Sequence, residues 1–189
     1  MSLFQNIIVI LLLIAAAGFL SLTEIALAGA RKVKLKILAE SGELRAQKVL
    51  DLQAQSANFF AASQIGLNAI AILGGILGEA AFRPYFVELM QHFYNGPWLE
   101  TIGFALSFTL VTSLFILFAD LMPKRLAMIA PEKIAIRVID PIQVFIKVCK
   151  PLAWGINAIA NLLFRLFKVN TVRDDNITFD DISAVMDAG

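Results

Sequence analysis

The sequence predicts an all-helical integral membrane protein with three transmembrane helices. Of its 189 residues, 59% are hydrophobic and only 16% are charged, whereas a soluble domain is about half apolar and a quarter charged. The apolar residues form three largely uncharged runs, each long enough to cross a bilayer as a helix of about 20 residues. Lipid is therefore expected around much of the surface.

The three runs define the predicted spans. The first covers 1–30 and is interrupted only by Glu24, the second covers 52–78, and the third covers 101–119. No basic segment precedes the first run, so we expect it to stay in the protein as a helix and not to be removed as a signal peptide.

Basic residues indicate how the spans are oriented. They follow the first and third runs at Arg31, Lys32, Lys34, Lys36, Arg45, Lys48, Lys124 and Arg125. The connection 83–100 has no such excess, and its Tyr85, Tyr94 and Trp98 suit an aromatic belt at the opposite interface. Since positive loops remain in the cytoplasm, we expect the N-terminus outside and the C-terminus in the cytoplasm of a bacterial inner membrane.

The organisation changes after the predicted core at 1–133. The segment 134–170 is apolar, but charges interrupt it and prolines divide it into short pieces, which predicts amphipathic helices along the membrane interface. A fourth span within 151–169 remains an alternative, because tilting and snorkelling can accommodate a short segment. In the final segment, 171–189, Thr178 and Asp181 resemble a capping box and predict the start of an acidic helix.

The first span carries a carboxylate, Glu24, with Ser21 on the same helix face. A charge at membrane depth is costly, so by default it faces a protein interior or water and indicates a cation path. The alternative is an interfacial Glu24 that reaches the cytoplasm and pairs with Arg31 or Lys32.

The second span carries amides at Gln64 and Asn68, four residues apart. Their oxygens suit a cation, but amides also join helices by hydrogen bonding, and both roles stay open. Gly74 and Gly78 form a small-xxx-small pair, which is typical of close helix contact or dimerisation.

The third span ends in a predicted helix break. A polar stripe at helical spacing consists of Thr109, Thr112, Ser113 and Asp120. Pro123 lacks the amide hydrogen that would bond the carbonyl of Ala119, and a free carbonyl beside a carboxylate is a recurrent cation site in transporters. Alternatively, Pro123 only ends the span and Asp120 already lies in cytoplasmic water.

The same residues argue against other classes of function. Cys149 is the single cysteine, which excludes an internal disulfide or a thiolate metal cluster, and the single histidine, His92, lies in the outer loop. No hydrolase, zinc-protease or phosphate-loop motif is present. We therefore expect no enzyme and no nucleic-acid partner, and a small cation as the ligand.

Three motifs in order resemble the DUF21 transmembrane domain of the CNNM and CorC/CorB magnesium transport proteins. They are Ser-Leu-Thr-Glu at 21–24, Gln-Ile-Gly-Leu-Asn at 64–68 and Asp-Leu-Met-Pro-Lys at 120–124. The resemblance implies a homodimer with three spans and a belt of juxtamembrane helices in each subunit. It also implies an acidic linker and a cytoplasmic CBS-pair module that binds adenine nucleotide, which we expect beyond residue 189.

The resemblance further implies which residues bind the cation. The implied set is Ser21, Thr23, Glu24, Gln64, Asn68, Ala119 and Asp120, with Pro123 and Lys124 at the helix break. Two positions depart from the magnesium branch: Leu67 replaces a frequent Asn, and Ala119-Asp120 replaces Gly-Glu. The sequence around them is closer to the polyamine export branch, whose members resemble exporters of putrescine and cadaverine.

These departures favour a diamine over Mg²⁺, which requires a compact, nearly octahedral oxygen shell at about 2.1 Å. The first hypothesis is therefore polyamine export, with Glu24 and Asp120 meeting the two ammonium groups and Asn68 orienting the molecule. The second is Mg²⁺ transport through Ser21, Glu24, Asn68 and Asp120, with water completing the shell. The third is a sensor or scaffold that transports nothing.

Overall fold

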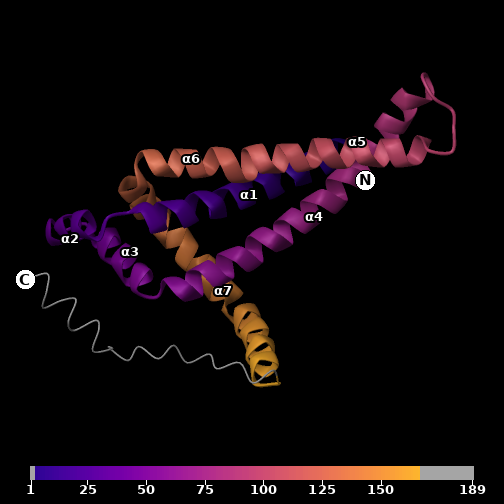
Figure 1. Ribbon diagram of the computed structural model, residues 1–189. Helices are drawn as coiled ribbons and strands as arrows, with labels where there is room; N and C mark the ends of the chain where they lie inside the picture. The colour runs from indigo at the N-terminus through magenta and orange to yellow at the C-terminus, as the bar shows by residue number, and fades with distance from the viewer. Residues whose placement is uncertain (1–2, 167–189) are drawn as a thin grey trace, which may run out of the picture. The chain divides into compact units, whose positions relative to one another are not determined.

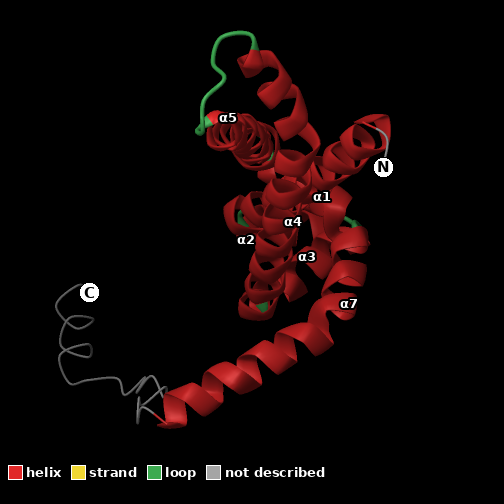
Figure 2. Cartoon of the chain, turned by 90° about the vertical axis from the view of Figure 1, so that its right-hand side faces the viewer, coloured by secondary structure: helices red, strands yellow, loops and turns green. Residues whose placement is uncertain are grey.

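A computed structural model describes residues 3–166, and within that range the chain forms helices and no strands. Contacts divide the chain into one unit that ends at Ala153 and another that begins at Trp154. Figure 2 shows the helices and the short loops that join them. The acidic helix expected within 171–189 lies outside the described residues.

Three helical rods correspond to the predicted spans. The first is α1 (Leu3–Gly29) and the second is α4 (Ser56–Gln91). The third consists of α5 (Leu99–Leu114), the π-helix η1 (Phe115–Leu121) and α6 (Met122–Ile129). Each rod contains a stretch that is long and apolar enough to cross a membrane, which confirms the predicted all-helical, three-span class.

The third rod does not break at Pro123 as expected, but continues to Ile129. The amide of Met122 donates to the carbonyl of Leu117, five residues earlier, which is the hydrogen-bond pattern of a π-helix. Pro123 then occupies the first turn of α6, where a missing amide hydrogen costs least. If this five-residue spacing is continued to Pro123, the carbonyl that lacks an amide donor belongs to Phe118. The prediction from an α-helical spacing was Ala119, one residue later.

The rods pack closely where small residues allow it. Figure 1 shows α1 beside the rod formed by α5 and α6, and α4 diverging from that rod toward the end that carries α2 and α3. On α4, a Cβ added at Gly74 would overlap the ring of Phe115, and one added at Gly78 would lie 2.5 Å from Cγ1 of Val111. The small-xxx-small pair therefore serves a helix contact within the chain.

Three further helices lie outside the three rods. They are α2 (Lys32–Glu40), α3 (Leu44–Ala54) and α7 (Pro131–Leu166). Gly42 joins α2 to α3 with a φ of +100°, a conformation that suits glycine. Leu35 and Val49 from this hairpin are fully buried in one apolar cluster with residues of α7.

The structure corrects one expectation for the segment after residue 133. Pro141 and Pro151 do not divide it into short pieces, since α7 continues through both prolines. Over the described residues, α7 is also not among the helices that are apolar enough to cross a membrane.

Candidate functional site

A polar pocket with a volume of about 410 Å³ lies between α1, α4 and the third rod. Its polar lining consists of Ser21, Glu24, Gln64, Asn68, Asp120 and Lys124. Its apolar lining consists of Ala17, Leu67, Ala71, Phe115, Ile116 and Ala119. The structure therefore gathers most of the predicted cation ligands, from three separate stretches of sequence, around one space.

Helix geometry explains how each rod contributes to the polar pocket. On α1, Ser21 and Glu24 are one turn apart and share a face. On α4, Gln64 and Asn68 repeat at a spacing of four. On the third rod, η1 presents Ala119 and Asp120 together. π-Helical segments of this kind occur frequently at functional sites.

Asp120 connects two of the rods through its carboxylate. Ser21 Oγ on α1 donates to Asp120 Oδ1 at 3.4 Å. The ammonium of Lys124, one turn further along the third rod, contacts the same oxygen at 2.5 Å. Asp120 therefore contacts two protein groups of the pocket. Lys124, which was expected only as part of a helix break, is its counter-ion.

The other oxygen-bearing groups of the pocket have no such partners. Within the described part of the chain, neither Glu24 nor the amides of Gln64 and Asn68 form an ion pair or a side-chain hydrogen bond. Arg31, one alternative partner of Glu24, instead binds Glu132 at 2.9 Å. Glu24 is half-buried, whereas Gln64 and Asn68 are exposed, so all three side chains are free to contact a ligand in the pocket.

Some predicted polar residues lie elsewhere. Thr23 is fully buried outside the pocket, and its hydroxyl donates to the carbonyl of Phe19 at 2.7 Å. From the predicted stripe on the third rod, Thr109, Thr112 and Ser113 also lie outside the pocket lining. Leu67 was noted in the sequence only because it replaces an Asn that is frequent in the magnesium branch. In the structure it contributes apolar surface to the pocket.

The charge of the polar pocket favours a cation. Glu24 and Asp120 are negative and Lys124 is positive, so the lining has a net charge of −1. Among residues 3–166, no three His, Cys, Asp or Glu side chains gather as they would around a metal ion. A divalent metal held here would have to rely on two carboxylates, neutral oxygens and water.

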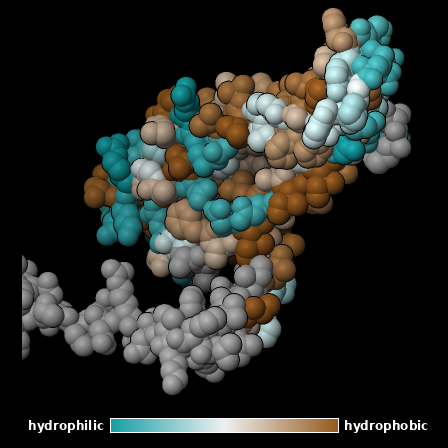
Figure 3. Space-filling view, turned by 45° about the vertical axis from the view of Figure 1, so that its right-hand side comes forward, coloured by the Kyte–Doolittle hydropathy of each residue, from teal (hydrophilic) through white to brown (hydrophobic). Residues whose placement is uncertain are grey.

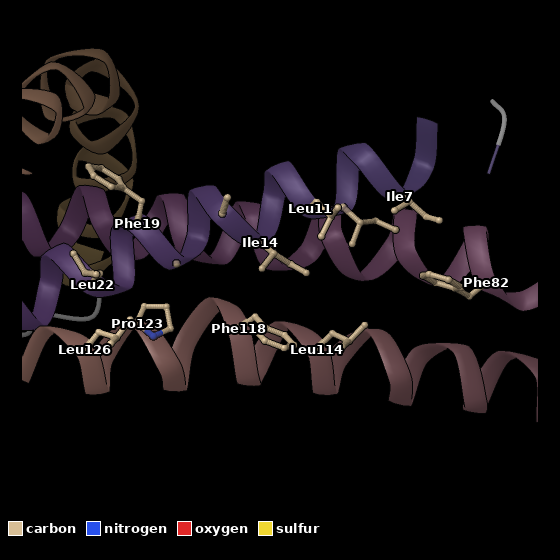
Figure 4. Close-up of a pocket in the computed structure, with 13 residues that line it drawn as sticks. Ile7, Leu11, Ile14, Phe19, Leu22, Phe82, Leu114, Phe118, Pro123 and Leu126 are labelled. Atoms are coloured by element: carbon tan, nitrogen blue, oxygen red, sulfur yellow. The ribbon is translucent and has the colours of Figure 1, made fainter. Parts of the chain in front are cut away.

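A second pocket on the bundle has the opposite character. It has a volume of about 680 Å³ and lies between α1 and the third rod. Figure 4 shows Leu11 and Ile14 of α1 opposite Leu114 and Phe118 of the third rod. All 13 residues that line this second pocket are apolar. Because it offers a cation no ligand, the smaller polar pocket is the candidate site.

The chain is similar to known proteins over nearly its whole length. The model of the cyclin M transmembrane N-terminal domain matches residues 7–189. The polyamine export protein of Escherichia coli K12 is 52% identical over 98% of this chain and 41% of its own length. That of Haemophilus influenzae is 44% identical over 100% of this chain and 44% of its own length. A UPF0053 protein of Synechocystis is 30% identical over 95% of this chain and 40% of its own length.

Proposed function

Because the chain belongs to the family of the cyclin M transmembrane N-terminal domain, we propose that it forms the membrane part of a polyamine exporter. The chain spans less than half the length of the relatives that are named polyamine export proteins. The observation that carries the proposal is the polar pocket, in which two carboxylates and two amides meet apolar surface. Its volume of about 410 Å³ lies within the usual range of about 300–1,000 Å³ for small-molecule sites.

A diamine such as putrescine or cadaverine matches this lining group by group. One ammonium takes the place of Lys124 beside Asp120 and Ser21, and the other binds Glu24. Each ammonium has three hydrogens to donate, and the oxygens of Gln64 and Asn68 accept the remaining ones. The carbon stem between the two ammonium groups lies against apolar residues such as Leu67.

Lys124 gives this site a built-in competitor. Its ammonium already occupies the oxygen of Asp120 that a substrate ammonium would use. With Lys124 in place the lining carries −1, whereas the two carboxylates alone carry −2 and balance a diamine of charge +2. We therefore expect substrate entry to displace Lys124, and its return to help expel the substrate.

This competition predicts how Lys124 variants behave. Replacing Lys124 by Gln leaves Asp120 without an internal cation, so putrescine should bind roughly tenfold or more tightly, because close charge pairs are worth over 1.4 kcal/mol. The matched control Lys124→Arg keeps the competing charge and should bind putrescine nearly as the parent does. Isothermal titration in detergent measures both. Weaker putrescine binding by Lys124→Gln would contradict the displacement.

The proposal includes a membrane arrangement. The chain lies in a bacterial inner membrane as a homodimer, with its N-terminus outside, and it catalyses no reaction. The end of the bundle that carries α2 and α3 faces the cytoplasm. The support is the concentration of lysine and arginine at that end, since positive loops stay in the cytoplasm.

The test is export from proteoliposomes loaded with labelled putrescine. We expect efflux above protein-free vesicles, and loss of that efflux in Glu24→Gln. A Mg²⁺ flux that depends on Glu24 and Asp120, without putrescine efflux, would replace the proposal by divalent-cation transport. No flux of either cation, together with no binding of putrescine, would favour a sensor or scaffold.

A further inference from the structure

Two adjoining grooves lie between the α2–α3 hairpin and the start of α7. The first has a volume of about 650 Å³ and the second about 450 Å³. They share Lys34, Glu132 and Lys133 and together form what we call the basic groove. The basic groove shares no residue with the polar pocket.

The basic groove carries an excess of positive charge. Its charged lining consists of Arg31, Lys34, Arg45, Lys133 and Arg137 against Glu43 and Glu132. Figure 3 shows hydrophilic surface gathered over the end of the molecule that carries α2 and α3. An anion is therefore the ligand that this surface favours.

Part of this charge is held in place by the protein itself. Glu132 is buried, with 4% of its surface exposed, and it binds Arg31 at 2.9 Å and Lys34 at 3.3 Å. The hydrogen bond from Arg31 is the main reason why the pKa of Glu132 falls to about 2. The carboxylate therefore stays ionised and fixes two cations at the wall of the groove.

Two other cations of the basic groove are unpaired. Lys133 and Arg137 are one turn apart on α7, and neither has an ion-pair partner among residues 3–166. Arg45, by contrast, binds Asp140 at 2.9 Å. Lys133 and Arg137 are therefore free to bind an anion.

The basic groove also borders exposed apolar surface. Met128 and Ile129 line its smaller part, and 70% and 78% of their surfaces are exposed. They form the last turn of the third rod, at the end of its candidate membrane span. A soluble anion would use only the charges, whereas a phospholipid would also cover the apolar residues.

We propose that the basic groove binds an anionic phospholipid, with the phosphate at Lys133 and Arg137 and an acyl chain against Met128 and Ile129. The bound lipid joins the start of α7 to the end of α6. Basic pockets beside transmembrane helices bind acidic headgroups in this way. The assignment rests on the groove alone and does not depend on which cation the polar pocket accepts.

The test compares thermal unfolding and native mass spectra of the protein in micelles that contain phosphatidylglycerol or phosphatidylcholine. We expect phosphatidylglycerol to stay bound and raise the Tm. In the double variant Lys133→Gln, Arg137→Gln, its affinity should fall roughly tenfold or more, because each basic residue near a membrane surface contributes substantially. The Tm in phosphatidylcholine alone should match the parent, which shows that the variant folds.

A matched control removes two charges elsewhere on α7, in Lys147→Gln, Lys150→Gln. This control should retain phosphatidylglycerol, and an equal loss there would overturn the proposal by showing general attraction to basic residues. Equal stabilisation by soluble glycerol phosphate would overturn it in favour of a free-anion site. Equal stabilisation by the two lipids would also overturn it.

Discussion

In the joint between the α2–α3 hairpin and α7, Glu132 and Asp140 each bind two basic side chains, whereas the carboxylates of the polar pocket are poorly paired. In the joint, the partners are Arg31 and Lys34 for Glu132, and Arg45 and Lys48 for Asp140. In the pocket, Asp120 forms an ion pair with Lys124 alone, and Glu24 has no charged partner among the described residues. The chain thus treats the same functional group in two ways.

This difference indicates that the carboxylates of the joint stabilise the fold, whereas those of the pocket bind a ligand. A carboxylate that is bound on both oxygens stabilises the contact it bridges, as in the joint. An incompletely paired carboxylate within a membrane-spanning helix costs free energy, and such a group is usually kept for an ion or a substrate. Changes in the pocket should therefore affect ligand binding more than folding, and changes in the joint should do the reverse.

The largest effect is expected in the pocket. The double variant Glu24→Gln, Asp120→Asn removes both charges that would meet a diamine, while keeping the size of the side chains. Putrescine affinity should fall by roughly 100-fold or more, because each desolvated charge pair contributes about 1.5 kcal/mol or more. Titration calorimetry measures the affinity, and thermal unfolding should show a Tm close to that of the parent. A large drop in Tm with intact binding would reverse the roles of pocket and joint.

In the joint, the expected effect is on stability and depends on pH. The pKa of Glu132 is lowered from 4.5 to about 2, chiefly by its hydrogen bond from Arg31. The stabilisation is therefore complete above pH 4.5 and disappears as the pH falls through about 2, with a size of about 3 kcal/mol.

The comparison with Glu132→Gln isolates this contribution, because the variant lacks the titrating group. It should lose about 1–3 kcal/mol of stability at neutral pH and show a shallower acid transition, while putrescine binding stays unchanged. Thermal unfolding between pH 6 and pH 2 measures both proteins. Identical acid transitions would show that Glu132 does not stabilise the joint.

A loss of stability of similar size is expected where α4 meets the third rod. Gly74→Ala places a methyl group against the ring of Phe115, which also lines the polar pocket. It should destabilise the protein by about 1–3 kcal/mol and weaken putrescine binding modestly. The neighbouring Gly75 is a matched control, because a Cβ there meets nothing within 4 Å. An equal loss of stability in Gly75→Ala would mean that the cost does not come from Phe115.

The smallest effect is expected at Thr23. Its hydroxyl is bound to the carbonyl of Phe19 on its own helix and lies outside the pocket. Thr23→Val should change stability by less than about 1 kcal/mol, since such a back-bond contributes little to a helix. Putrescine affinity should not change in calorimetry, and a tenfold loss would return Thr23 to the site.

Much of this arrangement could be predicted from single residues. The three rods followed from uncharged runs, and Glu24, Asn68 and Asp120 stood out as polar groups within them. The position of Thr23 could have been predicted from helix geometry. Residues two positions apart are rotated by about 200° around the helix axis, so Thr23 lies on the face opposite Ser21.

Other features depend on residues far apart in the sequence. Glu132 and Arg31 are separated by 101 positions, and no local pattern joins them. The π-helix before Pro123 also depends on packing, since Gly18 of α1 lets Pro123 approach: a Cβ added at Gly18 would lie 3.2 Å from Cγ of the proline ring. A proline at this point indicated only that the α-helical pattern must change.

The most direct test of the proposed site is an experimental density map of the protein with putrescine bound. We expect elongated density in the polar pocket, with one end at Glu24, the other at Asp120, and Lys124 turned away from Asp120. A compact peak with octahedral oxygen neighbours, or putrescine bound elsewhere while Lys124 stays on Asp120, would contradict it.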